Sequence, residues 1–365
     1  MIFEKRLFLS FAFSEINQAI INMSNFSKIK FSLFAISLSM LLFSCVEDKP
    51  DTTTTNPPAP VKAKYSIPKF DGQSAYDFVA KQVAFGHRLP GTETHKQTAE
   101  WLVSKFKEYG ATVTEQDFIA KVYWGEELPS KNIMAQFNPS AKKRILFAAH
   151  WDSRFAGDKD IERIDQPIDG ADDGGSGVGV LLEIARVLQA NPIDAADLGV
   201  DLILFDAEDQ GKDGDGTEDT SLTWCLGSQH WGKNIVPAGY SANYGILLDM
   251  VGSKNPRFGL EGYSMRFNPN LVRKVWKLAQ SMGYTNYFVN ENLGAVTDDH
   301  VFVSTYAGIP MIDIINKPTG SGERAGFGTY HHTHDDNMDI ISKKSLRIVG
   351  QVMLAVIYKE ASNTF

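Results

Sequence analysis

Short apolar segments alternate with longer helical segments along most of the chain beyond residue 65. Four of the apolar segments have the length of a strand and contain few polar residues. Strands covered on both faces show this pattern, which is typical of parallel sheets. The sequence therefore predicts buried strands of a mostly parallel sheet at residues 145–149, 202–205, 246–248 and 309–315.

The clearest amphipathic helix is expected at residues 94–109. Thr94 and Gln97 have the spacing of a capping box, and Gly110 follows as a helix stop. The helical period places three large apolar side chains on one face, namely Leu102, Phe106 and Tyr109. This face is expected to pack on the sheet.

Two further helices complete the predicted architecture. Residues 177–188 are apolar nearly all round, as in a helix buried against a sheet, and a last helix is expected at about 343–360. The chain shows no internal repeat and no second linker. We therefore predict a single α/β domain over residues 65–365, a three-layer sandwich with a mostly parallel mixed central sheet.

The N-terminal region has the features of a secretion signal. Residues 31–43 form a run of 13 uncharged, mostly apolar residues, too short to span a membrane as a helix, and Lys28 and Lys30 provide a positive flank. Met23 lies just upstream, so it is a candidate true start that would make residues 1–22 an extension.

The apolar run ends at Ser44 and Cys45, with Leu42 three positions before the cysteine. This arrangement resembles the lipobox of bacterial lipoproteins, in which the cysteine is lipidated and becomes the N-terminus. The alternative is a simple cleaved signal with an incidental cysteine. Lipidation is the favoured interpretation, with residues 1–45 as a lipoprotein signal peptide.

Residues 46–64 are rich in Thr and Pro and have few large apolar side chains. Such a segment cannot bury a core, so it predicts a disordered tether between the lipid and the folded domain. We expect the folded domain to be anchored by lipid to a membrane of the bacterial cell envelope, facing the periplasm or the outer surface.

Charge and cysteine content exclude several classes of protein. The 365 residues carry a net charge of -8, which argues against a nucleic-acid partner. The two cysteines, Cys45 and Cys225, are too few for a disulfide framework or a cysteine-bound zinc. A transition metal would therefore have to bind His, Asp and Glu.

Acidic residues and a histidine follow the predicted strands. His150 follows the first strand, Glu208 and Asp209 the second, and Asp249 the third. Because parallel strands of an open sheet end at the same edge, these side chains are expected to form one site. Each has a simpler alternative, such as a solvated loop for the acidic pair or a strand-end cap for Asp249.

Three further motifs can supply ligands. Residues 170–177 contain Asp173 in a glycine-rich turn, where it could bind a metal or cap a helix. Residues 297–300 read Thr-Asp-Asp-His. Residues 331–337 contain three of the eight histidines, which indicate either zinc ligands or a flexible loop.

In this order, the motifs resemble the zinc-aminopeptidase family over essentially all of residues 65–365. Residues 85–92 and 150–153 are similar to family signatures. Within the family, the Asp-Asp-His at 298–300 and the His-Thr-His-Asp-Asp-Asn at 332–337 are most similar to glutaminyl cyclases. Aminopeptidases usually have Ser-Asp-His and His-Thr-x-x-Asp-Thr instead.

The resemblance implies roles for individual residues. Asp173, Asp209 and His332 would bind one zinc ion per chain and leave a fourth position open. Glu208 would be the general acid/base. Asp249 and Asp299 would hydrogen-bond to Glu208.

This sequence departs from the animal enzymes at two positions. Asp209 replaces the usual Glu, although both side chains offer an oxygen ligand to zinc. His331 replaces the Trp that precedes the ligand histidine. Candidate aromatic walls of the substrate pocket are Trp151, Trp224 and Trp231.

The activity implied is the conversion of N-terminal Gln of peptides and proteins to pyroglutamate, with release of ammonia. The first alternative is a two-zinc aminopeptidase, in which His150 would be a second-metal or vestigial ligand and Asp173 would bridge. The second is a binding lipoprotein with an inactive site, which the intact Glu208 disfavours. The acidic loop at 211–220 loosely resembles a calcium loop but lacks the EF-hand spacing, so a solvated insertion is expected.

Overall fold

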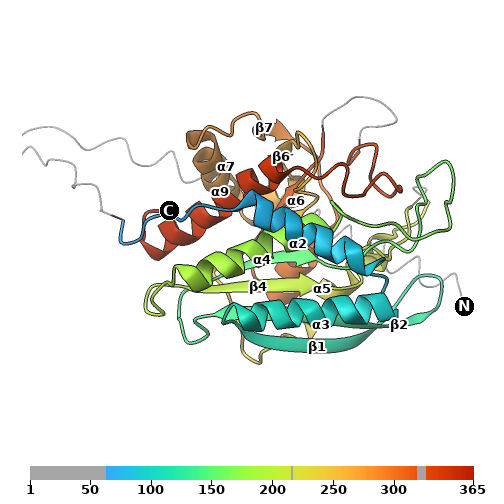
Figure 1. Cartoon of the computed structure of the whole chain (residues 1–365), viewed down its shortest axis with the longest axis horizontal. Coiled ribbons are helices and arrows are strands. Elements are labelled where there is room, and N and C mark those ends of the chain that lie inside the picture. Colours follow the sequence, from blue (N-terminus) through green and yellow to red (C-terminus); the bar gives the residue numbers. More distant parts are fainter. Residues whose placement is uncertain (1–62, 215–216, 319–325) are drawn as a thin grey trace, which may run out of the picture. The chain divides into compact units, whose positions relative to one another are not determined.

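The computed structural model describes residues 63–214, 217–318 and 326–365. Its centre is a six-stranded sheet in which β4, β3, β5 and β8 are parallel, while β1 and β2 are antiparallel to their neighbours (Figure 1). In spatial order the strands are β1 (Thr112–Lys121), β2 (Glu127–Phe137), β4 (Gly199–Phe205), β3 (Arg144–His150), β5 (Tyr244–Asp249) and β8 (Met311–Ile315).

All four predicted strands are confirmed as the parallel part of this sheet. Residues of β3, β4 and β8 are buried throughout, which explains their continuous apolar sequence. The β1–β2 hairpin was not predicted, because β1 alternates buried and exposed positions and is largely polar. The predicted three-layer α/β sandwich with a mixed, mostly parallel sheet is confirmed.

Helices cover both faces of the sheet. On one face, side chains such as Phe147 pack in a large core with α2 (Gly72–Phe85), α3 (Glu93–Glu108), α4 (Gly175–Ala190) and α9 (Lys343–Ala361). The neighbouring side chain Leu146 points to the other face, where a smaller core includes Trp231 of α5 (Leu226–Lys233). Successive strand residues thus serve opposite cores, as the period of two requires.

Helix α3 confirms the predicted amphipathic helix but corrects its start. The side chain of Thr92 accepts a hydrogen bond from the backbone N–H of His95, so Thr92 is the N-cap and Thr94 lies inside the helix. The proposed capping box of Thr94 and Gln97 is therefore wrong. Gly110 adopts a φ of +81° directly after the helix, as its role as a stop requires.

Helix α4 packs very closely on the sheet. A Cβ at Gly177 would lie 2.2 Å from the backbone oxygen of Leu248 in β5, so only glycine permits this approach. The contact fixes the N-terminal end of α4 beside the carboxyl end of β5. This end of α4 follows the turn that contains Asp173.

The remaining elements lie between β5 and β8 in the sequence or in short turns. They are β6 (Phe258–Leu260), α6 (Gly262–Phe267), α7 (Pro269–Ser281), β7 (Phe288–Asn292), α8 (Asp299–Phe302), a 3₁₀ turn at Ser221–Thr223 and a π-helical turn at Val303–Ala307. Strands β6 and β7 pair in a separate small sheet.

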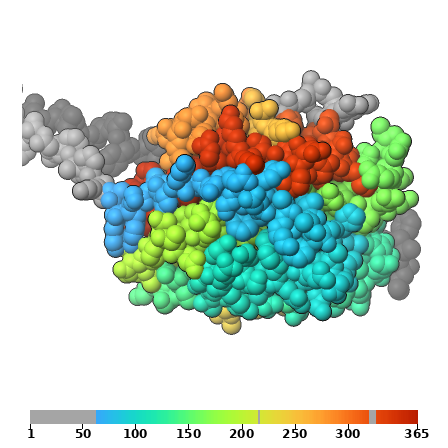
Figure 2. Space-filling view, in the orientation of Figure 1, coloured from blue at the N-terminus to red at the C-terminus, as the bar shows by residue number. Residues whose placement is uncertain are grey.

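The first described residues lie beside the C-terminal end of the chain. Lys64 forms an ion pair with Asp197 at 2.5 Å, and the N–H of Tyr65 donates to the hydroxyl of Ser362. In Figure 2, the segment that begins at residue 63 (blue) lies against α9 (red). The predicted signal peptide, Cys45 and nearly all of the predicted tether lie outside the described residues. Within the described ranges, no helix is both long and apolar enough to cross a membrane.

Candidate active site

The acidic residues and histidines predicted from sequence meet at the carboxyl ends of the parallel strands. They surround a cavity of about 520 Å³. Its lining includes Asp173, Glu208, Asp209, Asp249 and His332. Residues that are distant in the sequence thus form one site, as the topology of a parallel sheet predicts.

The turn before α4 is fixed by a carboxylate from the C-terminal part of the chain. The backbone N–H of Asp172 donates to Oδ1 of Asp336 at 2.7 Å, and that of Asp173 donates to Oδ2 at 3.1 Å. Asp336 is completely buried. The His-rich segment therefore helps to position Asp173 as well as supplying His332.

A second buried carboxylate holds the turn that follows β4. Asp152 accepts hydrogen bonds from the backbone N–H groups of Glu208 and Asp209, both at 3.1 Å. Ala207 adopts the left-handed conformation there, with a φ of +53°. The sharp turn separates the directions of the two neighbouring acids, so that they have different partners.

His332 lies between the two acids that the resemblance pairs with it. Its Nε2 is 3.2 Å from Oδ1 of Asp209 and 4.0 Å from Oδ2 of Asp173. Tetrahedral zinc ligands at bond lengths of about 2.0–2.1 Å lie about 3.3 Å apart. The distance between His332 and Asp209 matches this value, and the distance between His332 and Asp173 is longer.

The donor set also has the chemistry that a metal requires. Oδ2 of Asp209 is buried and has no hydrogen-bond partner within the described part of the chain. An ionised oxygen without a partner is costly to bury, and a cation would compensate for it. The residue types of this set are those that bind zinc. The group here whose ligand atoms all lie within 4.8 Å of one another is Asp173, His331 and His332. His331 lies in the same region, with its Nε2 3.7 Å from Oδ2 of Asp173.

His150 forms a second cluster of ligands around the other oxygen of Asp173. Its Nε2 lies 2.9 Å from Oδ1 of Asp173 and 3.3 Å from Oδ1 of Asp249. Its Nδ1 is 3.3 Å from Asp152, a contact that would orient the ring. The ligand types for a second metal are thus present, with Asp173 between the two clusters.

Glu208 is a neighbour of this metal set but has different partners. Its Oε1 accepts a hydrogen bond from the thiol of Cys225 at 3.0 Å, and Asp298 lies close to both groups. Burial raises the pKa of Glu208 well above its ordinary value. His150 opposes this shift, and the nearby carboxylates of Asp298 and Asp209 increase it. A carboxyl with a raised pKa holds its proton more strongly than an ordinary carboxyl, which is a property of many general acids and bases.

The predicted hydrogen bonds from Glu208 to Asp249 and Asp299 are not present in the described part of the chain, and of these two acids Asp249 lines the cavity whereas Asp299 does not. Burial raises the pKa of Asp249 to about 6, against the effect of His150. Asp299 is completely buried as the first residue of α8. Its charge raises the pKa of Glu208 less than that of Asp298 does. Asp298 is the acid that lies within 4.8 Å of both Glu208 and Cys225. Burial raises the pKa of Asp298 to about 7.

The structure separates the three candidate tryptophans. Trp224 lines the cavity and stacks on His332, with ring centroids 5.8 Å apart. Trp151 and Trp231 are fully buried and do not line it. Trp151 stacks on His95, and Trp231 packs in the smaller core, so the prediction that these two form pocket walls is wrong.

His331 lines the cavity beside His332. Its ring stacks on His332 at 3.7 Å between centroids and packs on Phe327 at 4.7 Å. An imidazole therefore provides the flat surface at this point of the cavity. Asp213 and Glu218 also line the cavity, which places the acidic loop beside the site.

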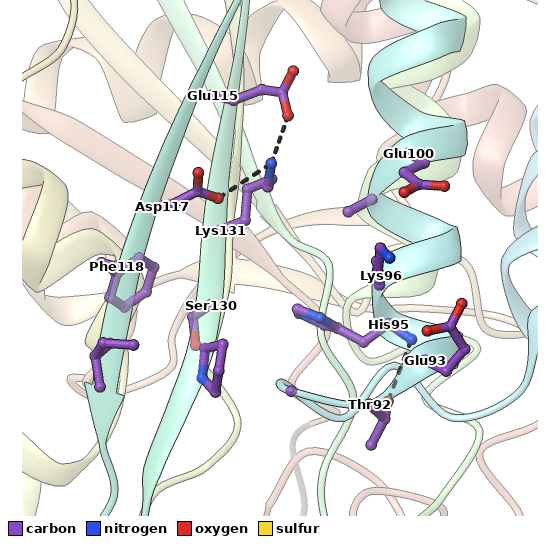
Figure 3. A pocket seen from close by; sticks show the side chains of 14 residues that line it. Thr92, Glu93, His95, Lys96, Glu100, Glu115, Asp117, Phe118, Ser130 and Lys131 are labelled. Atoms are coloured by element: carbon purple, nitrogen blue, oxygen red, sulfur yellow. Dashed lines mark hydrogen bonds and ion pairs between the residues drawn. The ribbon is translucent and has the colours of Figure 1, made fainter.

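A larger cavity of about 560 Å³ lies elsewhere, between α3 and the β1–β2 hairpin (Figure 3). Lys131 forms ion pairs with Glu115 and Asp117 on its wall. His95 lies in this cavity as well, and its Nε2 is 2.8 Å from the carboxylate of Asp206. The larger cavity thus contacts the turn after β4 through His95 and Asp206. The proposed metal ligands line the smaller cavity.

Sequence reasoning missed two residues that act on the acidic pair. Arg154 is buried, and its guanidinium donates to the backbone oxygen of Asp209 at 3.0 Å. In the sequence, Cys225 is only one of two cysteines. Arg154 follows the predicted strand end at His150 closely and could have been suspected, but no local pattern links Cys225 to Glu208.

The fold and the ligand set define a class, the zinc-aminopeptidase-like α/β enzymes. The chain belongs to peptidase family M28, whose model matches residues 132–357.

Known proteins similar to the chain include both cyclases and exopeptidases. The glutaminyl-peptide cyclotransferase of Drosophila melanogaster is 25% identical over 276 residues, covering 70% of this chain and 72% of that protein. The structure of Bacteroides thetaiotaomicron glutaminyl cyclase bound to N-acetylhistamine is 44% identical. Its TM-score is 0.76, and the match covers 80% of this chain and 99% of that one. A Zn-dependent exopeptidase from Parabacteroides distasonis is 47% identical, with the same TM-score and coverage.

Proposed function

We propose that this protein is a zinc-dependent glutaminyl-peptide cyclotransferase. It converts the N-terminal Gln of peptides and proteins to pyroglutamate and releases ammonia. The observation that carries the proposal is the position of Glu208, a buried carboxylate outside the metal ligand set at the wall of the same cavity. Similarity to cyclases from distant organisms supports this reaction over peptide hydrolysis.

The ligands proposed for a single zinc are Asp173, Asp209 and His332. When bound there, zinc would supply Lewis-acid chemistry toward the γ-carboxamide of the substrate. The turns held by Asp152 and Asp336 keep the ligand oxygens in place. These hydrogen bonds fix the main chain of Asp173 and Asp209, from which the two ligand carboxylates extend.

Glu208 is proposed as the proton shuttle. Its carboxylate takes a proton from the α-ammonium group of the substrate, which frees the amine to attack the γ-carbonyl carbon. After the attack the ring nitrogen loses a second proton. The C–N bond to the leaving group then breaks, Glu208 delivers one of the two protons to the departing nitrogen to give ammonia, and the other proton passes to solvent. Asp249 and Asp299 are proposed to support this exchange. Both reacting groups belong to one residue, so the cavity need only select the folded rotamer.

The direct test is incubation of the purified full chain with a peptide that begins with Gln. A mass loss of one ammonia, with the remaining sequence intact, is the expected result. A matched peptide that begins with Asn controls for general amide loss. Release of free N-terminal residues instead would indicate an aminopeptidase and contradict the proposal.

The cluster of His150, Asp173 and Asp249 is the feature that keeps the two-zinc aminopeptidase as an alternative. Metal analysis of the purified protein distinguishes the two enzymes. About one zinc per chain supports the cyclase, and about two supports the aminopeptidase.

The proposal extends to the location of the enzyme. We propose that Cys45 is lipidated and that the protein is anchored in a bacterial cell envelope, facing the periplasm or the outer surface. The support comes from the sequence, in which a short apolar run ends at a small residue and Cys45.

A further inference from the structure

Cys225 contacts Glu208 at two points. Its thiol donates to Oε1 of Glu208 at 3.0 Å, and its backbone N–H donates to the backbone oxygen of Glu208 at 2.9 Å. The cysteine is the N-cap of α5 and is completely buried. The side chain and the main chain of Glu208 are therefore both held by one residue from a different element.

The surrounding backbone is shaped to make these contacts. Cys225 has a φ of +58° and Ala207 a φ of +53°, so a left-handed residue lies in each of the two turns that meet here. The backbone N–H of Leu226 donates to the oxygen of Ala207 at 3.0 Å, which joins the turns. Left-handed conformations are unfavourable for these residue types and persist where the surroundings enforce them.

The thiol is suited to orient a base without neutralising it. Burial, together with the charge of Glu208, raises the pKa of Cys225 well above its ordinary value, so the thiol remains protonated and acts as a donor. A thiol is a weak and uncharged donor. The thiol therefore occupies one oxygen of Glu208 and leaves the charge of the carboxylate unchanged. An arginine at this position would compensate that negative charge.

We propose that Cys225 is a positioning residue, which holds one oxygen of Glu208 so that the other faces the substrate amine. The inference rests on the proposed function, because it assigns Glu208 the role of the base. The thiol donates to Glu208 and to none of the proposed metal ligands, so its effect is expected on turnover rather than on metal binding.

Three variants of the full chain test this role. Cys225→Ala removes the donor, and kcat should fall by about tenfold to a hundredfold, because a misplaced catalytic group loses much of its effect. KM should change by less than about threefold, and zinc content should be unchanged. Cys225→Ser retains a donor in nearly the same place, and it should recover most of the lost kcat. Leu226→Ala is the matched control, since it loosens packing in the same turn but leaves the thiol intact.

The outcomes separate this inference from the proposed function. If the wild-type chain does not cyclise a Gln-initiated peptide, the proposed function fails and this inference fails with it. If the wild type is active and Cys225→Ala keeps its kcat, only the positioning role is refuted. A Cys225→Ser variant as slow as Cys225→Ala, or a Leu226→Ala variant that loses as much kcat, would show that the cysteine serves packing alone.

Discussion

The difference between two adjacent acids determines the chemistry at the scale of single residues. Asp209 has one oxygen near His332 and another that is buried without a partner among the described residues. Glu208 points to Cys225 and Asp298 instead. The turn at Ala207 therefore directs the two acids to different partners, as the proposed roles of a metal ligand and a proton shuttle require.

The Glu208→Gln variant tests this division. Gln has the same size and keeps much of the hydrogen bonding, but it cannot take up a proton. We expect normal folding and zinc content, with kcat reduced by about 10²- to 10⁴-fold. The measurement is kcat together with zinc content, and Glu218→Gln, on the cavity wall, is the control. Turnover near the wild-type value would refute the shuttle, and loss of zinc would indicate that Glu208 and Asp209 exchange roles.

The His332→Ala variant tests the ligand set. Removal of the imidazole takes away the one proposed ligand that lies near both Asp173 and Asp209. We expect the variant to lose both zinc and activity, as measured by metal analysis after dialysis. His334→Ala is the matched control, because His334 contacts Asp160 outside the proposed ligand set. A His332→Ala protein with its full complement of zinc would overturn the assignment.

At the scale of elements, Glu261 connects the segments that follow β5 and precede β8. Its carboxylate caps α6 by accepting from the N–H groups of Tyr263 and Ser264, and it also accepts from the N–H of Val296. His300 of α8 lies 3.1 Å away. Burial opposes ionisation, but these donors lower the pKa of Glu261 to about 2. Helix α8, which begins at Asp299, is thereby tied to α6.

This connection predicts a pH-dependent contribution to stability. The folded-state pKa of Glu261 is below the unfolded value of 4.5, so its contribution is complete above about pH 4.5 and is lost as the pH falls toward about 2. Glu261→Gln should lower the free energy of unfolding by about 1–3 kcal/mol at pH 7. Urea denaturation at several pH values measures the difference, with the exposed Glu162→Gln as control. The prediction fails if the difference between wild type and Glu261→Gln stays constant down to pH 3.

At the scale of the whole molecule, the proposed membrane attachment depends on Cys45, which lies outside the described part of the chain. If Cys45 carries the lipid, the wild-type protein should partition into the detergent phase, and Cys45→Ala should move to the aqueous phase. The physical reason is that acyl chains contribute about 0.8 kcal/mol per buried CH₂. Cys225→Ser controls for the loss of a thiol. Equal release of wild type and Cys45→Ala into the aqueous phase would refute the lipid anchor.

The sequence by itself determined the parallel core of the sheet and the sites at its strand ends. Strands covered on both faces must be apolar throughout, so β3, β4, β5 and β8 were visible as local runs. The polar residues that follow them had to meet at one edge, because parallel strands end together. For this reason, the sequence alone predicts one site that contains His150, Glu208, Asp209 and Asp249.

The tertiary structure decided which side chains touch within that group. The β1–β2 hairpin, the burial of Trp151 and the bond from Cys225 to Glu208 all depend on contacts between distant segments. A tryptophan that lines a cavity cannot be distinguished in the sequence from one that packs in a core. Only the tertiary packing distinguishes Trp224 from Trp151. Cys225 is the partner of Glu208 because two turns meet, each of which contains one residue in the left-handed conformation. No local sequence pattern predicts that these two turns meet.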